Sequence, residues 1–197
     1  MQENIFQKEW LKTAPNEPQE GDYYIAVDPA GFTFEPDKRR KINIDNTAIS
    51  VVKVRDNNWW ISEIAFGRWT HIQVAKKILS LIEDYDPVAV GIESGLYKQA
   101  IYNHLFSLLP KDFDLNKLYE LSHKKLNKVE RIKIYLQKRF QLGYISLNNE
   151  GSWHDEFIKE FEAFPSTKVK DDLIDSLAFI EQLISARRVS SYPVGVP

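Results

Sequence analysis

YYIAVD, at residues 23–28, and PVAVGIES, at residues 87–94, are two short, largely apolar runs that both close on an acidic side chain. Runs of this kind are typical of buried strands inside a sheet. Asp28 ends the first run, and Glu93 lies at the end of the second. If the two strands are parallel neighbours, both carboxylates emerge at one end of the sheet, which is where α/β proteins usually bind ligands.

The segment between these two runs predicts a hairpin and a helix. Residues 29–45 are polar and predict a long loop or a mobile hairpin. Residues 46–56 and 58–69 are rich in β-branched and aromatic side chains around the turn sequence Asp56-Asn57-Asn58, so they predict two paired strands. The next stretch, 71–85, predicts a helix whose apolar face consists of Ile72, Ala75, Ile78, Leu79 and Ile82.

Alternating helices and strands complete the chain. Periodicity and Pro or Gly stops predict helices over residues 96–109, 128–142, 154–164 and 170–188, and short strands over 117–122 and 144–147. This order predicts an α/β fold with a mixed central sheet, a hairpin meander followed by parallel strands, flanked by helices. The domain boundaries that we expect are a linker or packed arm over 1–22, one domain over 23–188 and a flexible tail over 189–197.

The composition excludes several kinds of site. The chain has 197 residues and no cysteine, which excludes disulfides and thiolate-bound metals. No apolar run approaches the length of a membrane span, and the N-terminus has no signal-peptide pattern. A formal net charge of −2 weighs against binding nucleic acid by bulk charge, so any contact with DNA must rest on a local basic surface.

A third acidic group lies at the start of the last predicted helix. Asp172 and Asp175 share one face of that helix, and Asp171 lies off that face as a cap or an auxiliary ligand. Carboxylates that converge repel one another, and Mg²⁺ or Mn²⁺ would relieve the repulsion because both prefer oxygen ligands. Two such ions can activate a water molecule and stabilise the leaving oxygen of a phosphodiester.

Each carboxylate also has a purely structural interpretation. Asp28 precedes Pro29, where an aspartate often serves only to form a turn. Asp171 and Asp172 lie in a first helical turn, where capping and the helix dipole favour acidic residues. Glu93 fits a structural role least well, because a carboxylate that ends a buried apolar run is costly unless it is paired or coordinated.

Taken in order, these motifs resemble the C-terminal nuclease domain of the large terminase subunit of tailed bacteriophages. YYIAVDPAG with DNTAISVVKV is similar to the family's first acidic strand and the strand after it, and VAVGIESG to its second acidic strand. LSHKKLNKVERI and LGYISL resemble its Lys-x-x-Arg-Ile helix and the following strand. WHDEFIKEFEAFPSTKVKDDLIDSLAF resembles its closing signature, so the likeness covers residues 23 to about 188.

The resemblance implies an RNase-H-like fold and a two-metal endonuclease that uses Mg²⁺ or Mn²⁺. Its substrate would be double-stranded viral DNA, cut with little sequence preference during genome packaging. By motif, Asp28 would bridge both metals, Glu93 would bind one and Asp172 the other. Asp171 or Asp175 would complete the set.

The resemblance also implies partners. The family's other half is a packaging ATPase domain, which would precede this one in the full protein. This chain has no G-x-x-x-x-G-K-[ST] sequence, so we expect no ATP hydrolysis from it. The small terminase subunit and the portal would be further partners in the host cytoplasm, without a membrane. We expect the isolated domain to be a monomer with weak metal affinity, and we do not expect Asp45, after a long insertion, to reach the metals.

A local excess of basic residues offers a surface for DNA. Residues 116–139 hold eight Lys or Arg against two Glu, and a second basic group lies in the long loop. Such clusters bind the phosphate backbone without reading sequence, although a solvated surface is the alternative. The residues expected to contact DNA are Lys124, Lys125, Lys128, Arg131, Lys38, Arg39 and Arg40.

Two other functions remain open from the sequence. A Holliday-junction resolvase or a transposase-type nuclease would have the same fold and acidic site. A non-catalytic DNA-binding or capsid-docking module would have the basic surface without cleavage. The absence of a helix-turn-helix pattern makes the module the weaker alternative.

Overall fold

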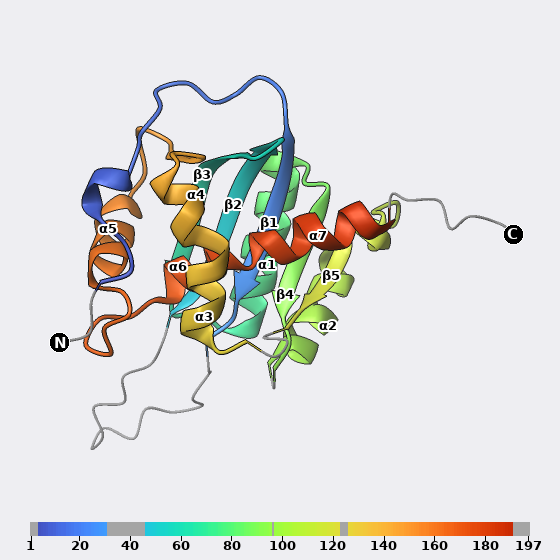
Figure 1. The fold of residues 1–197 in the computed structure, drawn as a ribbon. Helices are drawn as coiled ribbons and strands as arrows, with labels where there is room; N and C mark the ends of the chain where they lie inside the picture. Colours follow the sequence, from blue (N-terminus) through green and yellow to red (C-terminus); the bar gives the residue numbers. More distant parts are fainter. Residues whose placement is uncertain (1–3, 31–45, 96, 123–125, 191–197) are drawn as a thin grey trace, which may run out of the picture.

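The computed structural model describes residues 4–30, 46–95, 97–122 and 126–190, which form a mixed sheet of six strands between two layers of helices (Figure 1). The order across the sheet is β5-β4-β1-β2-β3-β6. The strands are β1 (Asp22–Asp28), β2 (Thr47–Arg55), β3 (Asn58–Gly67), β4 (Ala89–Glu93), β5 (Leu118–Leu121) and β6 (Ile145–Leu147).

The pairing of the strands confirms the predicted mixed sheet. β1, β2 and β3 form an antiparallel meander. β4 pairs in parallel with β1, and β5 pairs in parallel with β4. β6 is parallel to β3 at the opposite edge. β1 and β4 are therefore the parallel neighbours that the predicted convergence of Asp28 and Glu93 requires.

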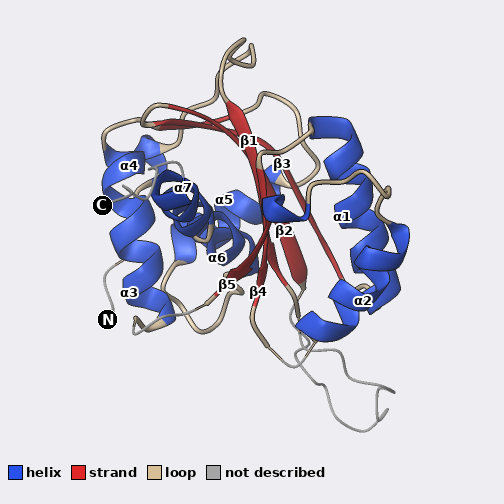
Figure 2. Ribbon diagram, turned by 90° about the vertical axis from the view of Figure 1, so that its right-hand side faces the viewer, coloured by secondary structure: helices blue, strands red, loops and turns tan. Residues whose placement is uncertain are grey.

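The helices form two unequal layers (Figure 2). α1 and α2 cover one face of the sheet, and the remaining helices lie on the other side, with α6 and α7 against the strands. No helix in the described ranges is long and apolar enough to span a lipid bilayer. The helices are α1 (His71–Tyr85), α2 (Lys98–Leu108), α3 (Lys128–Ile132), α4 (Lys138–Gln141), α5 (His154–Ala163), α6 (Asp172–Ala178) and α7 (Ile180–Ser190).

Local sequence accounts for α1, whose predicted bounds are confirmed. Thr70 and Gln73 form a reciprocal capping box at its start, which satisfies backbone N–H groups that have no partner within the helix. The helix ends at Asp86, whose φ of 40° is left-handed. The predicted apolar face needs one correction, because Ile72 is 47% exposed and the buried stripe begins at Val74.

Two predicted helices are divided in the structure. The helix predicted over 128–142 runs as α3, a π-helical stretch (Lys133–Gln137) and α4. The helix predicted over 170–188 begins at Asp172 and divides at Phe179 into α6 and α7. The division lets α6 pack on β2 while α7 follows β1 and β4.

Alternation along the central strands sorts side chains between the two faces. Ile25 and Val27 of β1 belong to the apolar cluster that includes α1 and α2. Tyr24 and Ala26 belong to the cluster that includes α3, α5, α6 and α7. Because successive side chains of a strand point to opposite faces, Asp28 falls on the α6 side. Glu93 lies on the same side, because it is four residues after Ala89, whose side chain belongs to the cluster on that face.

The segment before β1 is packed and contributes to the core. Phe6 is only 2% exposed, and its ring stacks on Phe161 of α5 at a centroid distance of 4.5 Å. The backbone N–H of Ile5 donates to the carbonyl of Phe164 (3.1 Å), and Thr13 forms a β-bridge with Leu147. The arm predicted over 1–22 is thus attached to the domain in its described part.

Candidate metal centre

Asp28 and Glu93 lie side by side at the carboxyl ends of two central strands. The parallel register pairs Val27 of β1 with Ile92 of β4, so the residues that follow them are adjacent. Glu93 is buried, and Asp28 is partly buried. The structure thus brings together the first two carboxylates that the sequence singled out.

The electrostatic state of Asp28 shows which other groups are close. Burial raises the pKa of Asp28 well above its usual range, and the charge of Asp175 and a hydrogen bond and charge from Glu93 raise it further. Lys128 opposes the shift. Carboxylates from β4 and α6 therefore both act on Asp28 of β1, and this repulsion favours a proton or a cation beside Asp28.

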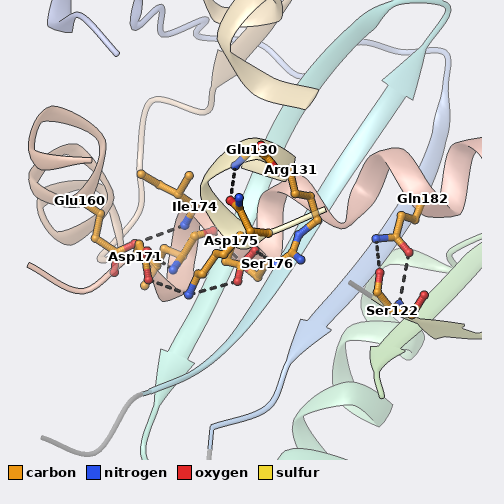
Figure 3. A network of polar contacts seen from close by, with 12 residues as sticks. Ser122, Glu130, Arg131, Glu160, Asp171, Ile174, Asp175, Ser176 and Gln182 are labelled. Carbon is orange, nitrogen blue, oxygen red and sulfur yellow. Dashed lines mark hydrogen bonds and ion pairs between the residues drawn. The ribbon is translucent and has the colours of Figure 1, made fainter. Parts of the chain in front are cut away.

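Asp175 is held by two cations from α3 (Figure 3). It is 2% exposed, and its Oδ1 accepts a hydrogen bond from the guanidinium of Arg131 at 2.5 Å. The ammonium of Lys128 lies 3.1 Å from Asp175 Oδ2 and 2.7 Å from Asp171 Oδ1. Burial alone would lower the pKa of Lys128, but the charges of Asp175, Asp171 and Asp28 outweigh it and raise that pKa above its usual range.

Asp172 faces a different neighbour. It is buried, and its Oδ2 accepts the backbone N–H of Asn46 at 2.9 Å, at the point where the chain re-enters the sheet. Asp171 occupies the N-cap position of α6, yet its side chain makes no capping hydrogen bond. The capping interpretation therefore fails for Asp171, whose carboxylate pairs with Lys128.

Glu160 of α5 caps α6 in its place, and the sequence analysis missed this residue. Its Oε2 accepts the backbone N–H groups of Leu173 (2.9 Å) and Ile174 (3.2 Å). The pKa of Glu160 is raised to about 8, chiefly by burial; the charges of Asp172 and Asp171 add to the increase, and the two backbone hydrogen bonds oppose it. No local pattern indicates this role, because the carboxylate comes from another helix and the bond depends on the tertiary fold.

Two polar contacts fix the surroundings of the cluster. The hydroxyl of Ser176 lies 2.7 Å from that of Ser50 and seats α6 on the middle of β2. The side-chain amide of Gln182 accepts from the backbone N–H of Ser122 (3.3 Å) and donates to its carbonyl (2.8 Å), as Figure 3 shows. The second contact holds the chain just after β5, next to the acidic end of β4.

The predicted DNA contacts are only partly visible. Lys128 lies within the acidic cluster. Arg131 is 1% exposed, pairs with Asp175 and stacks on the ring of Phe179 at 4.4 Å, so it supports the cluster from inside and does not present its guanidinium at the surface. The other predicted DNA contacts lie outside the described residues; they are Lys124, Lys125, Lys38, Arg39 and Arg40. Asp45 also lies outside them.

The donor set suits a hard divalent cation. Carboxylate oxygens are the ligands that Mg²⁺ and Mn²⁺ prefer, and burial together with the neighbouring carboxylates raises the pKa of Asp28 at the same place. Within the described ranges, no three His, Asp or Glu side chains are grouped as ready-made ligands of one ion. Side-chain movement on binding would therefore have to complete the coordination, with Asp28, Glu93 and Asp175 as the nearest set.

A family model described as the terminase RNaseH-like domain matches residues 25–181. The match includes both strand-end carboxylates and the whole of α6. A search of curated protein sequences gave no significant match.

Solved structures of terminases have the same fold. The large terminase of a thermophilic bacteriophage superposes with a TM-score of 0.63 at 11% identity, over 92% of this chain and 44% of that one. This chain thus spans less than half of that phage protein. The human cytomegalovirus terminase nuclease domain, soaked with Mn and inhibitor-bound, gives 0.61 at 14% identity, over 97% of this chain and 100% of that one. The nuclease of the large terminase from thermophilic phage G20c, with bound zinc, gives 0.60 at 18%, over 91% and 98%.

Proposed function

We propose a nuclease function from one premise: this chain belongs to the family of terminase RNase H-like domains. Its function would be metal-dependent hydrolysis of phosphodiester bonds in double-stranded viral DNA, with little sequence preference, during genome packaging. The observation that supports this most directly is the convergence of Asp28, Glu93 and Asp175 from three separate elements at the carboxyl end of the sheet.

The roles of the acidic residues follow from their positions. Asp28, between Glu93 and the start of α6, would contact both of two divalent cations. Glu93 would hold one, and a carboxylate of α6 the other. The sequence favoured Asp172 for this place, with Asp171 or Asp175 completing the set. The charge of Asp175 raises the pKa of Asp28, which supports a place for Asp175 in this set.

Mg²⁺ or Mn²⁺ would supply an activated water and stabilise the leaving oxygen. The residues of the chain would bind and orient. Arg131 would hold the carboxylate of Asp175 in place at the site, and Lys128 would hold positive charge beside it, where a phosphate oxygen of DNA could also bind. We extend the phosphate contacts to Lys124, Lys125, Lys38, Arg39 and Arg40 as sequence-based proposals.

The neighbouring structures support a divalent cation without fixing its identity. The G20c nuclease has been solved with bound zinc, cobalt and magnesium, and the cytomegalovirus domain after a Mn soak. We propose Mg²⁺ or Mn²⁺ here because the donor set contains only oxygen. A packaging ATPase domain, the small terminase subunit and the portal are the proposed partners of the whole protein.

Plasmid cleavage tests the proposal. The folded domain should convert supercoiled plasmid to nicked and linear forms with Mn²⁺ or Mg²⁺, and EDTA should stop the reaction. Asp28→Ala should abolish cutting while circular dichroism shows an unchanged fold. Folded wild-type protein that never nicks DNA over a full range of metal concentrations would remove the proposal.

The same assay separates the alternatives. A strong preference for four-way junctions over linear duplex would replace the packaging nuclease with a junction resolvase. Tight DNA binding without metal-dependent cutting would point to a non-catalytic module. Equal cutting of unrelated linear duplexes is the result that we expect.

A further inference from the structure

We infer that Glu160 is a positioning residue of the acidic cluster: it takes over the capping of α6 and so leaves the aspartates of that helix available to cations. This role rests on the proposed function, because it concerns the same site. Glu160 would support the site without contacting metal or DNA itself.

The start of α6 is capped by a residue of another helix and not by its own N-cap residue. A helix begins with backbone N–H groups that have no partner within the helix, and an Asp at the N-cap normally accepts one of them through its own side chain. Asp171 stands at that position and makes no such bond. The N–H groups of Leu173 and Ile174 donate to Glu160 Oε2.

Because Glu160 caps α6, the acidic side chains at the start of this helix are not used as caps. The carboxylate of Asp171 turns to Lys128 at 2.7 Å, and that of Asp172 accepts from Asn46. Asp175, one turn further, faces Asp28 and Arg131. If Asp171 capped its own helix, its carboxylate could not pair with Lys128 in the same geometry, and the position of Lys128 beside Asp175 would change.

Glu160 is well placed to act as a fixed anchor. It is 1% exposed, and its neighbour Phe161 packs between Phe6 and Phe140, at centroid distances of 4.5 and 4.7 Å. A side chain whose backbone is locked in an aromatic cluster loses little additional freedom when it binds. Figure 3 shows Glu160 reaching from α5 to Ile174, on the side of α6 away from Gln182.

Reach and charge can be separated by two conservative variants. Glu160→Asp keeps the carboxylate but shortens the side chain by one methylene, so it withdraws the acceptor from α6. Glu160→Gln keeps the length and an oxygen that can accept both N–H groups, but it has no negative charge. The other carboxylate oxygen of Glu160, Oε1, has no hydrogen-bond partner in the described part of the chain, so the amide nitrogen that Glu160→Gln introduces displaces no bond there.

Two measurements on the whole chain report the role. NMR hydrogen exchange of the Leu173 and Ile174 amides reports the cap directly. The Mn²⁺ concentration that gives half of the maximal thermal stabilisation reports the cation site without any cleavage assay. For Glu160→Asp we expect faster exchange at both amides and a Mn²⁺ midpoint about tenfold higher, the usual loss when a supporting contact of a metal site is removed. Glu160→Gln should stay close to wild type in both.

A matched control separates a general loss of stability from a specific effect on Mn²⁺ binding. Thr70→Ala deletes a cap of α1, on the other face of the sheet, and should lower the melting temperature without moving the Mn²⁺ midpoint. A Glu160→Asp midpoint equal to wild type, or a Glu160→Gln midpoint shifted as far as that of Glu160→Asp, would overturn the inference. Wild-type protein without any Mn²⁺ response would instead overturn the proposed function, and the role of Glu160 with it.

Discussion

The two faces of the sheet are built on different principles. The buried residues of α1 and α2 are all apolar, and they close over the sheet without any charge. The opposite face buries Arg131, Glu160, Asp172 and Asp175 among its apolar side chains. Burying charge costs stability unless each group is paired, so the second face holds an arrangement that stability alone would not favour.

The starts of α1 and α6 show the same contrast on a local scale. α1 is capped by its own Thr70 and Gln73, within one turn of sequence. α6 is capped by Glu160 from another helix. The α1 face can thus form from local signals, whereas the α6 face depends on tertiary contacts. The comparison teaches that apolar packing holds both faces of the sheet, whereas the buried charges of the described helices lie on the α6 face alone.

The largest effect should come from Asp28, which lies at the centre of the charged face. Asp28→Asn should reduce metal-dependent plasmid cutting about a thousandfold, equivalent to roughly 4 kcal/mol in the activation barrier. The metal-free protein should become more stable by about 1 kcal/mol, because burial and the neighbouring carboxylates raise the pKa of Asp28 and so favour a neutral side chain. Rate assays and urea melts with EDTA measure both. A variant that is inactive and less stable would break the separation of the two faces.

The second effect concerns the ion pair between α3 and α6. Arg131→Met should destabilise the domain by about 3 kcal/mol, because Asp175 would be left buried without its guanidinium. The double variant Arg131→Met/Asp175→Leu should recover most of that loss and remain unable to cut DNA. Denaturant melts of the three proteins make the comparison. No recovery in the double variant would mean that packing, and not charge, sets the cost.

The third effect is a dependence of stability on pH. The folded state holds protons on Asp28 and Glu160 more tightly than the unfolded chain, because burial raises both pKa values, to about 8 for Glu160. Stability that is present near pH 5 should therefore be lost as the pH rises towards about 8, by roughly 1 kcal/mol or more. Thermal melts in EDTA at several pH values test this, and Mn²⁺ at high pH should restore the part of the loss that comes from Asp28. A melting temperature that climbs with pH over this range would contradict it.

The smallest effect belongs to the apolar face. Thr70→Ala should cost about 1 kcal/mol of folding free energy and leave the rate of DNA cutting unchanged. Thermal melts and plasmid assays on the same preparation provide both values. A substantial change in cutting rate would show that the α1 face also shapes the site, and the contrast between the faces would weaken.

The sequence predicted the part of the site that depends on local pattern. Two apolar runs ending in Asp28 and Glu93 predicted parallel strands whose ends meet, and the register of Val27 with Ile92 confirms this. Hairpin and helix signals predicted the order of the elements, since turns and caps are local features.

The rest depended on contacts between distant segments. The last helix divides at Phe179, where no Pro or Gly in the sequence predicts a break. Arg131 lies in a basic stretch and reads as a surface residue, yet it is buried because Asp175 and Phe179 lie against it. Glu160 reads as one polar position of an amphipathic helix. Its role appears only when the loop after α5 returns the chain to the same place.

The burial of Phe6 has a mechanical consequence. Its ring is stacked on Phe161, and the preceding residue, Ile5, is hydrogen-bonded to the carbonyl of Phe164, so the segment holds α5 at both ends of one turn. Glu160 directly precedes Phe161 in α5. Tension applied to the chain before Phe6 would act on α5 first. It would then be transmitted to the start of α6, where the aspartates lie, through the two hydrogen bonds that Glu160 accepts.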